Sequence, residues 1–436
     1  MFKKTFPIRR EKILIRAEKL SLVFFGCVAL FNLVYAIFFI IHITEAGLVD
    51  MNRYWNCGLY IRRNMNPYHA HLNKIELSLP IRLVGGSSVD SGLANTLLFL
   101  PGYPGNTAPF VFLFSVFSFL PLKYAAVIWS VLNILFAVFI PLIILKIFRA
   151  YGISLPEYFE VLSVLVFFSL NMTFRGIIGN GQTTSLIFLF LCLSVLFFKR
   201  GQPIFAGLVL GLALSKYNVA VPVFIFFLMR RQFKILSIAV LVQLIGVLFL
   251  SLWAWVSPIE IVEDYLAIAF FHATISYVHG INISAYFPKS ILVSLCSFLI
   301  VTILYGVGFY FSAGRSTKIK LSSGQDDLPI LNLLFLWTLL SLYHLGYDTI
   351  LAVFPLLFII LRFYKIKTPL IFCRGVGLDM LLTVLALILL ILPGSVFRLI
   401  LPGTSLDSFA MTVAVGFFSI VSVRVTFPIY AETSQR

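Results

Sequence analysis

One acidic residue stands where a carboxylate could do chemistry. Asp50 follows the first long apolar run of the chain, in the stretch Val49 to Trp55. A carboxylate at the mouth of a membrane segment loses hydration and packs poorly, so it is a poor structural residue. It makes a good general base if a lipid-borne substrate is presented at that depth. The structural alternative is an interfacial or helix-capping aspartate that pairs with Arg53.

Three other polar residues lie between apolar runs. Lys216 separates two short runs, where a cation could hold a phosphate or could extend its stem to the membrane interface. Arg175 and Gln182 are interpreted as members of one turn. Arg175 is a second candidate for the phosphate, and Gln182 could donate hydrogen bonds to a sugar or a phosphate. A solvated turn is the alternative for both.

A histidine and an aspartate flank a predicted tight turn further along the chain. His344 could orient a donor or assist a proton transfer together with Asp348, or the two could simply end neighbouring helices. Arg62 and Arg63 are better suited to anionic lipid headgroups than to a substrate phosphate. His279 and Asn282 lie in a polar segment that could reach a sugar.

Several titratable residues belong to no motif: His69, His71, Glu260, Glu263 and Asp264. The carboxylates raise the question of a metal site, but we favour ordinary surface solvation. We therefore predict no metal and no cofactor. The chain also has no phosphate-cradling glycine loop, so direct use of a nucleotide sugar is not expected.

Composition defines the class of protein that must position these residues. Of the 436 residues, 60% are hydrophobic and 11% are charged, with a mean hydropathy of +1.02. This composition predicts a polytopic membrane protein. The net charge of +16 does not indicate nucleic-acid binding, because the basic residues form short clusters between apolar runs. The five cysteines show no metal-binding spacing and no disulfide framework.

The apolar runs predict an all-α integral membrane protein with about 12 transmembrane helices. Several runs are shorter than the roughly 20 residues that a straight span needs, which favours a thinned or water-filled region on one side. The predicted spans are Leu20 to Ile43, Lys123 to Phe148, Tyr158 to Phe174, Thr183 to Phe198, Pro203 to Ser215, Tyr217 to Met229, Ile235 to Trp255, Ser290 to Ser312, Leu328 to Leu342, Thr349 to Leu361, Val376 to Leu392 and Phe409 to Val423.

The positions of the Lys and Arg clusters along the chain predict its membrane topology. With the Lys and Arg clusters inside, residues 1–19 form a cytoplasmic basic N-terminus, residues 20–424 a single membrane domain and residues 425–436 a cytoplasmic tail. Residues 44–122 are then the first extracytoplasmic loop. Within that loop, Pro109 to Pro121 is apolar but short, and we interpret it as a juxtamembrane or re-entrant helix, with a short true span as the alternative.

Four stretches in this order resemble the C-type glycosyltransferases, multispanning enzymes that use a sugar carried on a polyprenyl phosphate. Within that group the chain resembles the mannosyltransferase family of phosphatidylinositol mannoside assembly. The stretches are Asp50 and Tyr54 with Asn66-Pro67-Tyr68; Tyr103 to Pro109 with the apolar helix to Pro121 and Ala125 to Trp129; Gly179 to Gln182 with Lys199 to Gln202, Ala206 to Leu208, Gly211 to Lys216 and Arg230-Arg231; and Leu342-Tyr343-His344 before Pro355.

The resemblance implies an inverting transfer in which Asp50 deprotonates the acceptor hydroxyl. The donor would be a polyprenyl-phosphate hexose, expected to be mannose, and the acceptor a lipid-linked glycan, a glycolipid or a cell-envelope polysaccharide at the outer face of a bacterial plasma membrane. Membrane lipids are the other expected partners, and nucleic acid is not. The donor phosphate and sugar would be bound by Lys216, Arg175, Gln182, His344, Asp348, Tyr54 and Tyr68.

Two departures from the family pattern leave the identity of the acceptor open. The proline pair usual before the juxtamembrane helix is replaced by the separated Pro104 and Pro109, and the loop between Tyr68 and Pro101 is long. A flippase or transporter of lipid-linked saccharides is the alternative function, since transporters place polar residues at mid-membrane depth and often contain repeats. A non-catalytic binder of polyprenyl phosphate is a third possibility.

Overall fold

The computed structural model describes residues 6–43, 48–72, 106–274, 291–314, 327–342, 344, 346–365, 374–392 and 406–426, and every regular element within them is a helix. The helices are α1 (Phe6–Ile41), α2 (Val49–Arg62), α3 (Pro67–Leu72), α5 (Ala108–Ser115), η1 (Val116–Phe119), α6 (Leu122–Ala150), α7 (Phe159–Ser169), α8 (Asn171–Asn180), α9 (Thr184–Lys199), α10 (Pro203–Ala213), η2 (Leu214–Lys216), α11 (Tyr217–Met229), α12 (Phe233–Ala254), α13 (Pro258–Thr274), α14 (Ile291–Gly314), α15 (Asp327–Ser341), η4 (Gly346–Ala352), α16 (Val353–Lys365), α17 (Arg374–Ile391) and α19 (Leu406–Thr426).

The all-α prediction is confirmed for these residues, but twelve spans are not. Among the described residues, and by length and composition alone, four helical stretches could cross a membrane: Lys19–Ile41, Leu122–Ala150, Pro203–Met229 and Phe233–Ala254. The helices α7 and α8 add a fifth span if this bent pair counts as one. The other predicted spans that are described form apolar helices of 10–17 residues, including α9 and α15. A 16-residue helix is about 24 Å long, against roughly 30 Å of bilayer hydrocarbon.

One predicted span is broken. The sequence indicates a single span from Tyr158 to Phe174 followed by a turn, whereas the structure bends the chain by 64° between α7 and α8. The break is at Leu170, whose φ of −72° and ψ of 77° are not helical. Arg175 therefore lies within a helix, and it does not share a turn with Gln182 as predicted.

Polar contacts define one end of the bundle, here called the Asp327 end. The Tyr151 hydroxyl donates to the Asp327 carboxylate at 2.7 Å, and Arg230 forms an ion pair with the same carboxylate. The Lys199 ammonium lies 4.1 Å from the centre of the Tyr151 ring. Lys199 ends α9 and Arg230 follows α11, so the stretch Pro203–Met229 leaves this end and returns to it. Lys216 consequently lies at the apex of two short helices, as the sequence predicts.

The segment from Ala108 to Phe119 does not cross the bundle. Thr107, just before α5, donates its backbone N–H to the carbonyl of Ser215 beside the Lys216 apex at 3.1 Å. The chain then enters α6, where the Trp129 indole donates to the carbonyl of Gly181 at 2.9 Å. Both sides of the segment thus contact the end opposite Asp327.

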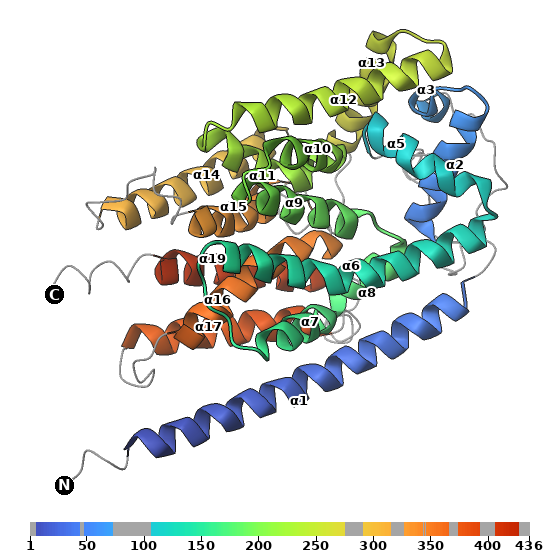
Figure 1. Cartoon of the computed structure of the whole chain (residues 1–436). Coiled ribbons are helices and arrows are strands. Elements are labelled where there is room, and N and C mark those ends of the chain that lie inside the picture. Colours follow the sequence, from blue (N-terminus) through green and yellow to red (C-terminus); the bar gives the residue numbers. More distant parts are fainter. Residues whose placement is uncertain are drawn as a thin grey trace.

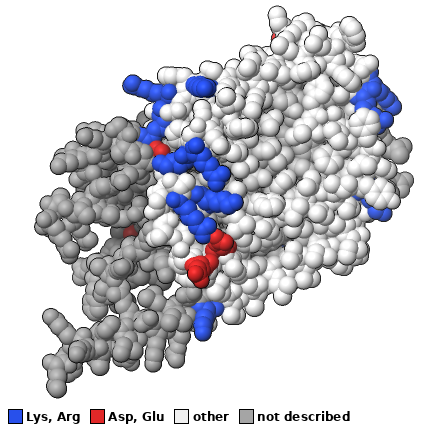
Figure 2. Space-filling model, viewed as in Figure 1, with Lys and Arg blue, Asp and Glu red and all other residues white. Residues whose placement is uncertain are grey.

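Figure 1 shows this arrangement, with α2, α3, α5 and α13 gathered at one end and the long helices α1, α6 and α12 running along the bundle. Glycines permit close packing of α10 on α12: a Cβ at Gly207 or Gly211 would meet Ile238 or Val242. In Figure 2, Lys and Arg gather along one edge of the visible face and a smaller group lies at the opposite edge, with a broad uncharged surface between them. This pattern is typical of a membrane-embedded bundle.

The predicted features that lie outside the described residues are the Gly85-Gly86-Ser87-Ser88 turn, Tyr103 and Pro104, His279 and Asn282, the Arg315, Lys318 and Lys320 cluster, Tyr343, and Cys373. The four described cysteines, Cys27, Cys57, Cys192 and Cys296, form no disulfide with one another.

Candidate active site

The first turn of α2 holds Asp50 in a buried position. Only 8% of Asp50 is exposed. One carboxylate oxygen accepts a hydrogen bond from Arg53 at 2.8 Å, and the other accepts one from the Gln182 amide. The helix N-terminus also favours a negative charge at this position. The ion pair with Arg53 is the contact that the structural alternative requires, so this contact alone does not distinguish a base from a capping residue.

Gln182 reaches Asp50 because of the turn that ends α8. Gly181 adopts φ +68° and ψ 41°, a left-handed conformation that glycine adopts without strain. A Cβ at Gly181 would lie 3.0 Å from the Leu48 and Met51 side chains on either side of Asp50. The Trp129 indole holds the Gly181 carbonyl from α6. The Gly179 to Gln182 motif therefore docks α8 against the start of α2.

Lys216 belongs to a second, adjoining polar group. Its ammonium contacts the Asp348 carboxylate at 2.7 Å and the Thr184 hydroxyl at 2.5 Å, and Thr184 donates to the same carboxylate at 2.9 Å. His344 Nδ1 lies 3.3 Å from the other oxygen of Asp348. The His344 Nε2 atom is buried and has no hydrogen-bond partner among the described residues. An orphaned ring nitrogen at a polar site is available to a ligand.

The electrostatics connect the two groups and distinguish the two aspartates. Burial raises the pKa of Asp50 above its ordinary value, and Arg53, Lys216 and the Gln182 hydrogen bond only partly oppose this effect. Burial also acts to raise the pKa of Asp348, but Lys216 and His344 outweigh it and hold that pKa well below the usual range. Lys216 and His344 thus favour the ionised form of Asp348, whereas burial gives Asp50 the higher proton affinity that a general base needs.

The predicted donor-binding residues have different surroundings. Tyr54 lies beside the Asp50 group, with its hydroxyl 3.4 Å from that of Thr183. Tyr68 instead braces a loop, since its hydroxyl donates to the Asn106 carbonyl at 3.0 Å next to the Thr107–Ser215 bond.

Arg175 faces α1. Its guanidinium lies 4.1 Å from the Tyr35 ring centre and 5.2 Å from that of Phe31, and its Nε donates to Asn32 at 3.2 Å. Its described contacts are therefore with α1 rather than with the Lys216 group.

Thr184 is a residue that the sequence analysis did not single out. It touches both charges of the Lys216–Asp348 pair. The polar run Thr183-Thr184-Ser185, directly after Gln182 and at the start of an apolar helix, is the signal that could have identified it. Thr173 and Thr349, also unpredicted, share a hydrogen bond of 2.5 Å that ties α8 to η4.

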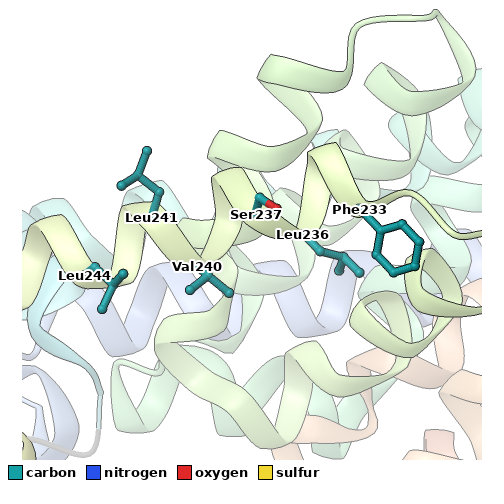
Figure 3. A pocket seen from close by; sticks show the side chains of 6 residues that line it. All are labelled: Phe233, Leu236, Ser237, Val240, Leu241 and Leu244. Atoms are coloured by element: carbon teal, nitrogen blue, oxygen red, sulfur yellow. The ribbon is translucent and has the colours of Figure 1, made fainter.

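The hollow in Figure 3 is not part of this site. It lies along α12 and is lined by Phe233, Leu236, Ser237, Val240, Leu241 and Leu244. Its lining is almost wholly apolar, with no charged side chain. Phe233 begins α12 just after Arg230, so the hollow starts at the Asp327 end.

The docking of α8 on α2 can be tested with a matched pair of glycines. Gly181 and Gly201 both have positive φ, but a Cβ at Gly201 would meet nothing within 4 Å. We expect Gly201→Ala to cost only the left-handed strain, about 1–2 kcal/mol. Gly181→Ala should cost more and should lower hydrogen-exchange protection at the start of α2. Equal unfolding free energies and unchanged protection for the two variants would contradict this packing role.

Known families provide an independent comparison for the same region. The model of glycosyltransferase family 87 matches residues 106–317, just under half of the chain. The match indicates a glycosyltransferase. No curated protein and no solved structure matches the chain.

The transferase match contains Arg175, Gln182, Thr184 and Lys216, while Asp50, His344 and Asp348 lie outside it. The structure brings the groups inside and outside the matched region together around Lys216 and Gln182. The match supports the predicted enzyme class, and it specifies no donor, acceptor or sugar.

Proposed function

We propose that this glycosyltransferase moves a hexose, expected to be mannose, from a polyprenyl-phosphate donor to a lipid-linked or cell-envelope glycan at the extracytoplasmic face of the membrane. The observation that carries the proposal is the junction of Asp50 with the Lys216–Asp348–His344 group. One half of this junction can accept a proton and the other can bind a phosphate. Together they match the two needs of an inverting transfer from a sugar phosphate.

The chemistry follows from the roles of the two groups. Asp50 removes the proton of the acceptor hydroxyl as its oxygen bonds to the anomeric carbon. The bond from that carbon to the phosphate oxygen breaks, and the electron pair leaves with the lipid phosphate. Lys216 stabilises the charge on that phosphate, and the free Nε2 of His344 is positioned for a second contact. Attack from the side opposite the leaving group inverts the anomeric configuration.

Two structural features support a lipid-borne donor at this end of the bundle. Lys216 is at the apex of α10 and α11, so it faces away from the end marked by Lys199 and Arg230. The basic clusters of the sequence favour the cytoplasm for that opposite end. The ion pair and hydrogen bond at Asp327 also join α6, α11 and α15 there. Contacts that hold these three helices together at that end favour an enzyme over the alternative flippase.

A donor panel tests the proposal directly. The purified protein in nanodiscs of native membrane lipids should transfer label from a polyprenyl-phosphate hexose, with mannose the expected sugar, and should not transfer it from GDP-mannose. The product should have the inverted anomeric configuration. Asp50→Asn in the same nanodiscs is the control for contaminating activity.

Three results would contradict the proposal. Transfer only from the nucleotide sugar would overturn the donor class. Retention of configuration would overturn the direct displacement by an Asp50-activated hydroxyl. Passage of intact lipid-linked saccharide across proteoliposomes, without cleavage of the sugar–phosphate bond, would favour the flippase.

A further inference from the structure

Three side chains with metal-ligating atoms meet on two helices that do not carry the Asp50 group. They are His69 of α3 and Glu260 and Asp264 of α13, and one ligand atom from each lies within 4.8 Å of the other two. Glu260 and Asp264 are four residues apart, so they share one face of α13, where two negative charges repel each other. The fold adds an imidazole to that face from a segment far away in the sequence.

The spacing of these atoms suits a small divalent cation. His69 Nδ1 lies 3.5 Å from a carboxylate oxygen of Asp264. In a tetrahedral zinc site with bonds of about 2.0–2.2 Å, two ligand atoms are separated by roughly 3.3–3.6 Å. The two atoms therefore already have the separation of zinc ligands. One nitrogen and two carboxylates also leave positions for water, as in open three-ligand sites.

A neighbouring amide fixes the Asp264 carboxylate. Asn66 is only 5% exposed, and its Nδ2 donates to the same Asp264 oxygen at 2.8 Å. The Asn66 side-chain oxygen accepts the backbone N–H of Tyr68 at 3.0 Å, so the direction of the amide is set. Hydrogen bonds of this kind orient the carboxylate ligands of metal sites.

We propose that His69, Glu260 and Asp264 bind one divalent cation of the zinc class, with water completing its coordination. An imidazole with two carboxylates favours zinc over magnesium, calcium or manganese, which are better suited to oxygen ligands. The cation joins α3 to α13 and so ties the segment after Asn66 and Pro67 to the helix that follows α12. This inference does not depend on the proposed transferase reaction.

Metal binding by the full-length protein tests the site. After EDTA treatment and dialysis, zinc and manganese chloride should be titrated separately into the nanodisc-embedded protein by calorimetry. The expected result is one saturable equivalent of zinc per chain and a rise in melting temperature. His69→Gln should weaken binding by at least about tenfold, and Asp264→Asn should do the same. The His69 side chain is 53% exposed, so its replacement should not unfold the chain.

Glu263→Gln is the matched control, because Glu263 is an exposed carboxylate on the same helix but outside the cluster. It should bind zinc like the unmodified protein. Absence of saturable zinc binding would overturn the proposal. So would binding that His69→Gln leaves unchanged, or that Glu263→Gln weakens as much as Asp264→Asn does, because both would indicate a non-specific acidic surface.

Discussion

Asp50→Asn should lower the transfer rate at saturating donor by about 10²–10⁴-fold, the usual contribution of general-base assistance. The amide keeps the shape of the side chain but cannot accept the proton of the acceptor. Donor affinity should change little, because the phosphate is assigned to the Lys216 group. The measurements are the transfer rate and polyprenyl-phosphate binding in the same nanodisc preparation. Near-normal transfer by Asp50→Asn would remove the base assignment.

Arg53→Gln separates the base from the capping alternative. It removes the ion pair with Asp50 and leaves the carboxylate in place. If Asp50 only stabilises α2, both variants should lower stability and rate by similar amounts. If Asp50 is the base, Arg53→Gln should retain most of the rate while Asp50→Asn does not.

The pH profile adds a further signature of Asp50. A base acts only when ionised, so the transfer rate should fall as pH drops through the pKa of Asp50. Burial raises that pKa, and Arg53, Lys216 and the Gln182 hydrogen bond lower it while Asp348 raises it. Loss of Arg53 should therefore move the acidic limb to higher pH. An acidic limb that does not move in Arg53→Gln would argue that another group titrates.

Lys216→Ala is expected to weaken binding of the donor lipid by about ten- to a hundredfold. A hydrogen bond to a charged group contributes roughly 1.5–3 kcal/mol, which corresponds to that range. The affinity can be measured with polyprenyl phosphate in nanodiscs. Lys199→Ala is the matched control, since Lys199 is a cation at the Asp327 end. Equal losses in the two variants would indicate a general charge effect, and unchanged affinity in Lys216→Ala would leave Lys216 as a counter-ion only.

Loss of Lys216 also removes the cation that pairs with the buried carboxylate of Asp348. Breaking a buried ion pair in this way can destabilise a protein by about 3–5 kcal/mol. The double variant Lys216→Ala/Asp348→Asn removes both charges and should restore folding without restoring donor affinity. Asp348→Asn alone releases Lys216 from its ion pair. If Lys216 binds the phosphate, Asp348→Asn should bind the donor at least as tightly as the unmodified protein, because the ammonium is no longer shared.

Composition and the order of charged and apolar runs were enough to predict that some candidate residues lie close together. Asp50, Gln182 and Lys216 were expected on the same side, and their side chains form adjoining groups. The Lys216 apex was expected from two short apolar runs. These features are local or depend on charge distribution, so they can be read without knowing how the helices pack.

Long-range packing supplied what the sequence could not. Arg175 lies against α1 because the chain bends at Leu170, and neither the bend nor its aromatic partners on α1 can be inferred from an apolar run. Thr184 becomes important only once Lys216 and Asp348 meet beside it. His69 and Asp264 are far apart in the sequence, and their pairing depends on how α3 contacts α13.

The short helices α9 and α15 determine how deep the Asp50 and Lys216 groups lie. Thr184 begins α9, and the helix ends 15 residues later at Lys199; α15 likewise starts at Asp327 and is about 22 Å long. If the charged ends at Lys199 and Asp327 lie at one headgroup layer, the proposed transfer takes place several ångströms beneath the other. A lipid-borne donor can then enter the proposed site laterally from the bilayer, with its lipid chain still among the acyl chains. The sugar of the proposed acceptor must reach below the headgroup layer, where little bulk water competes with its hydroxyl.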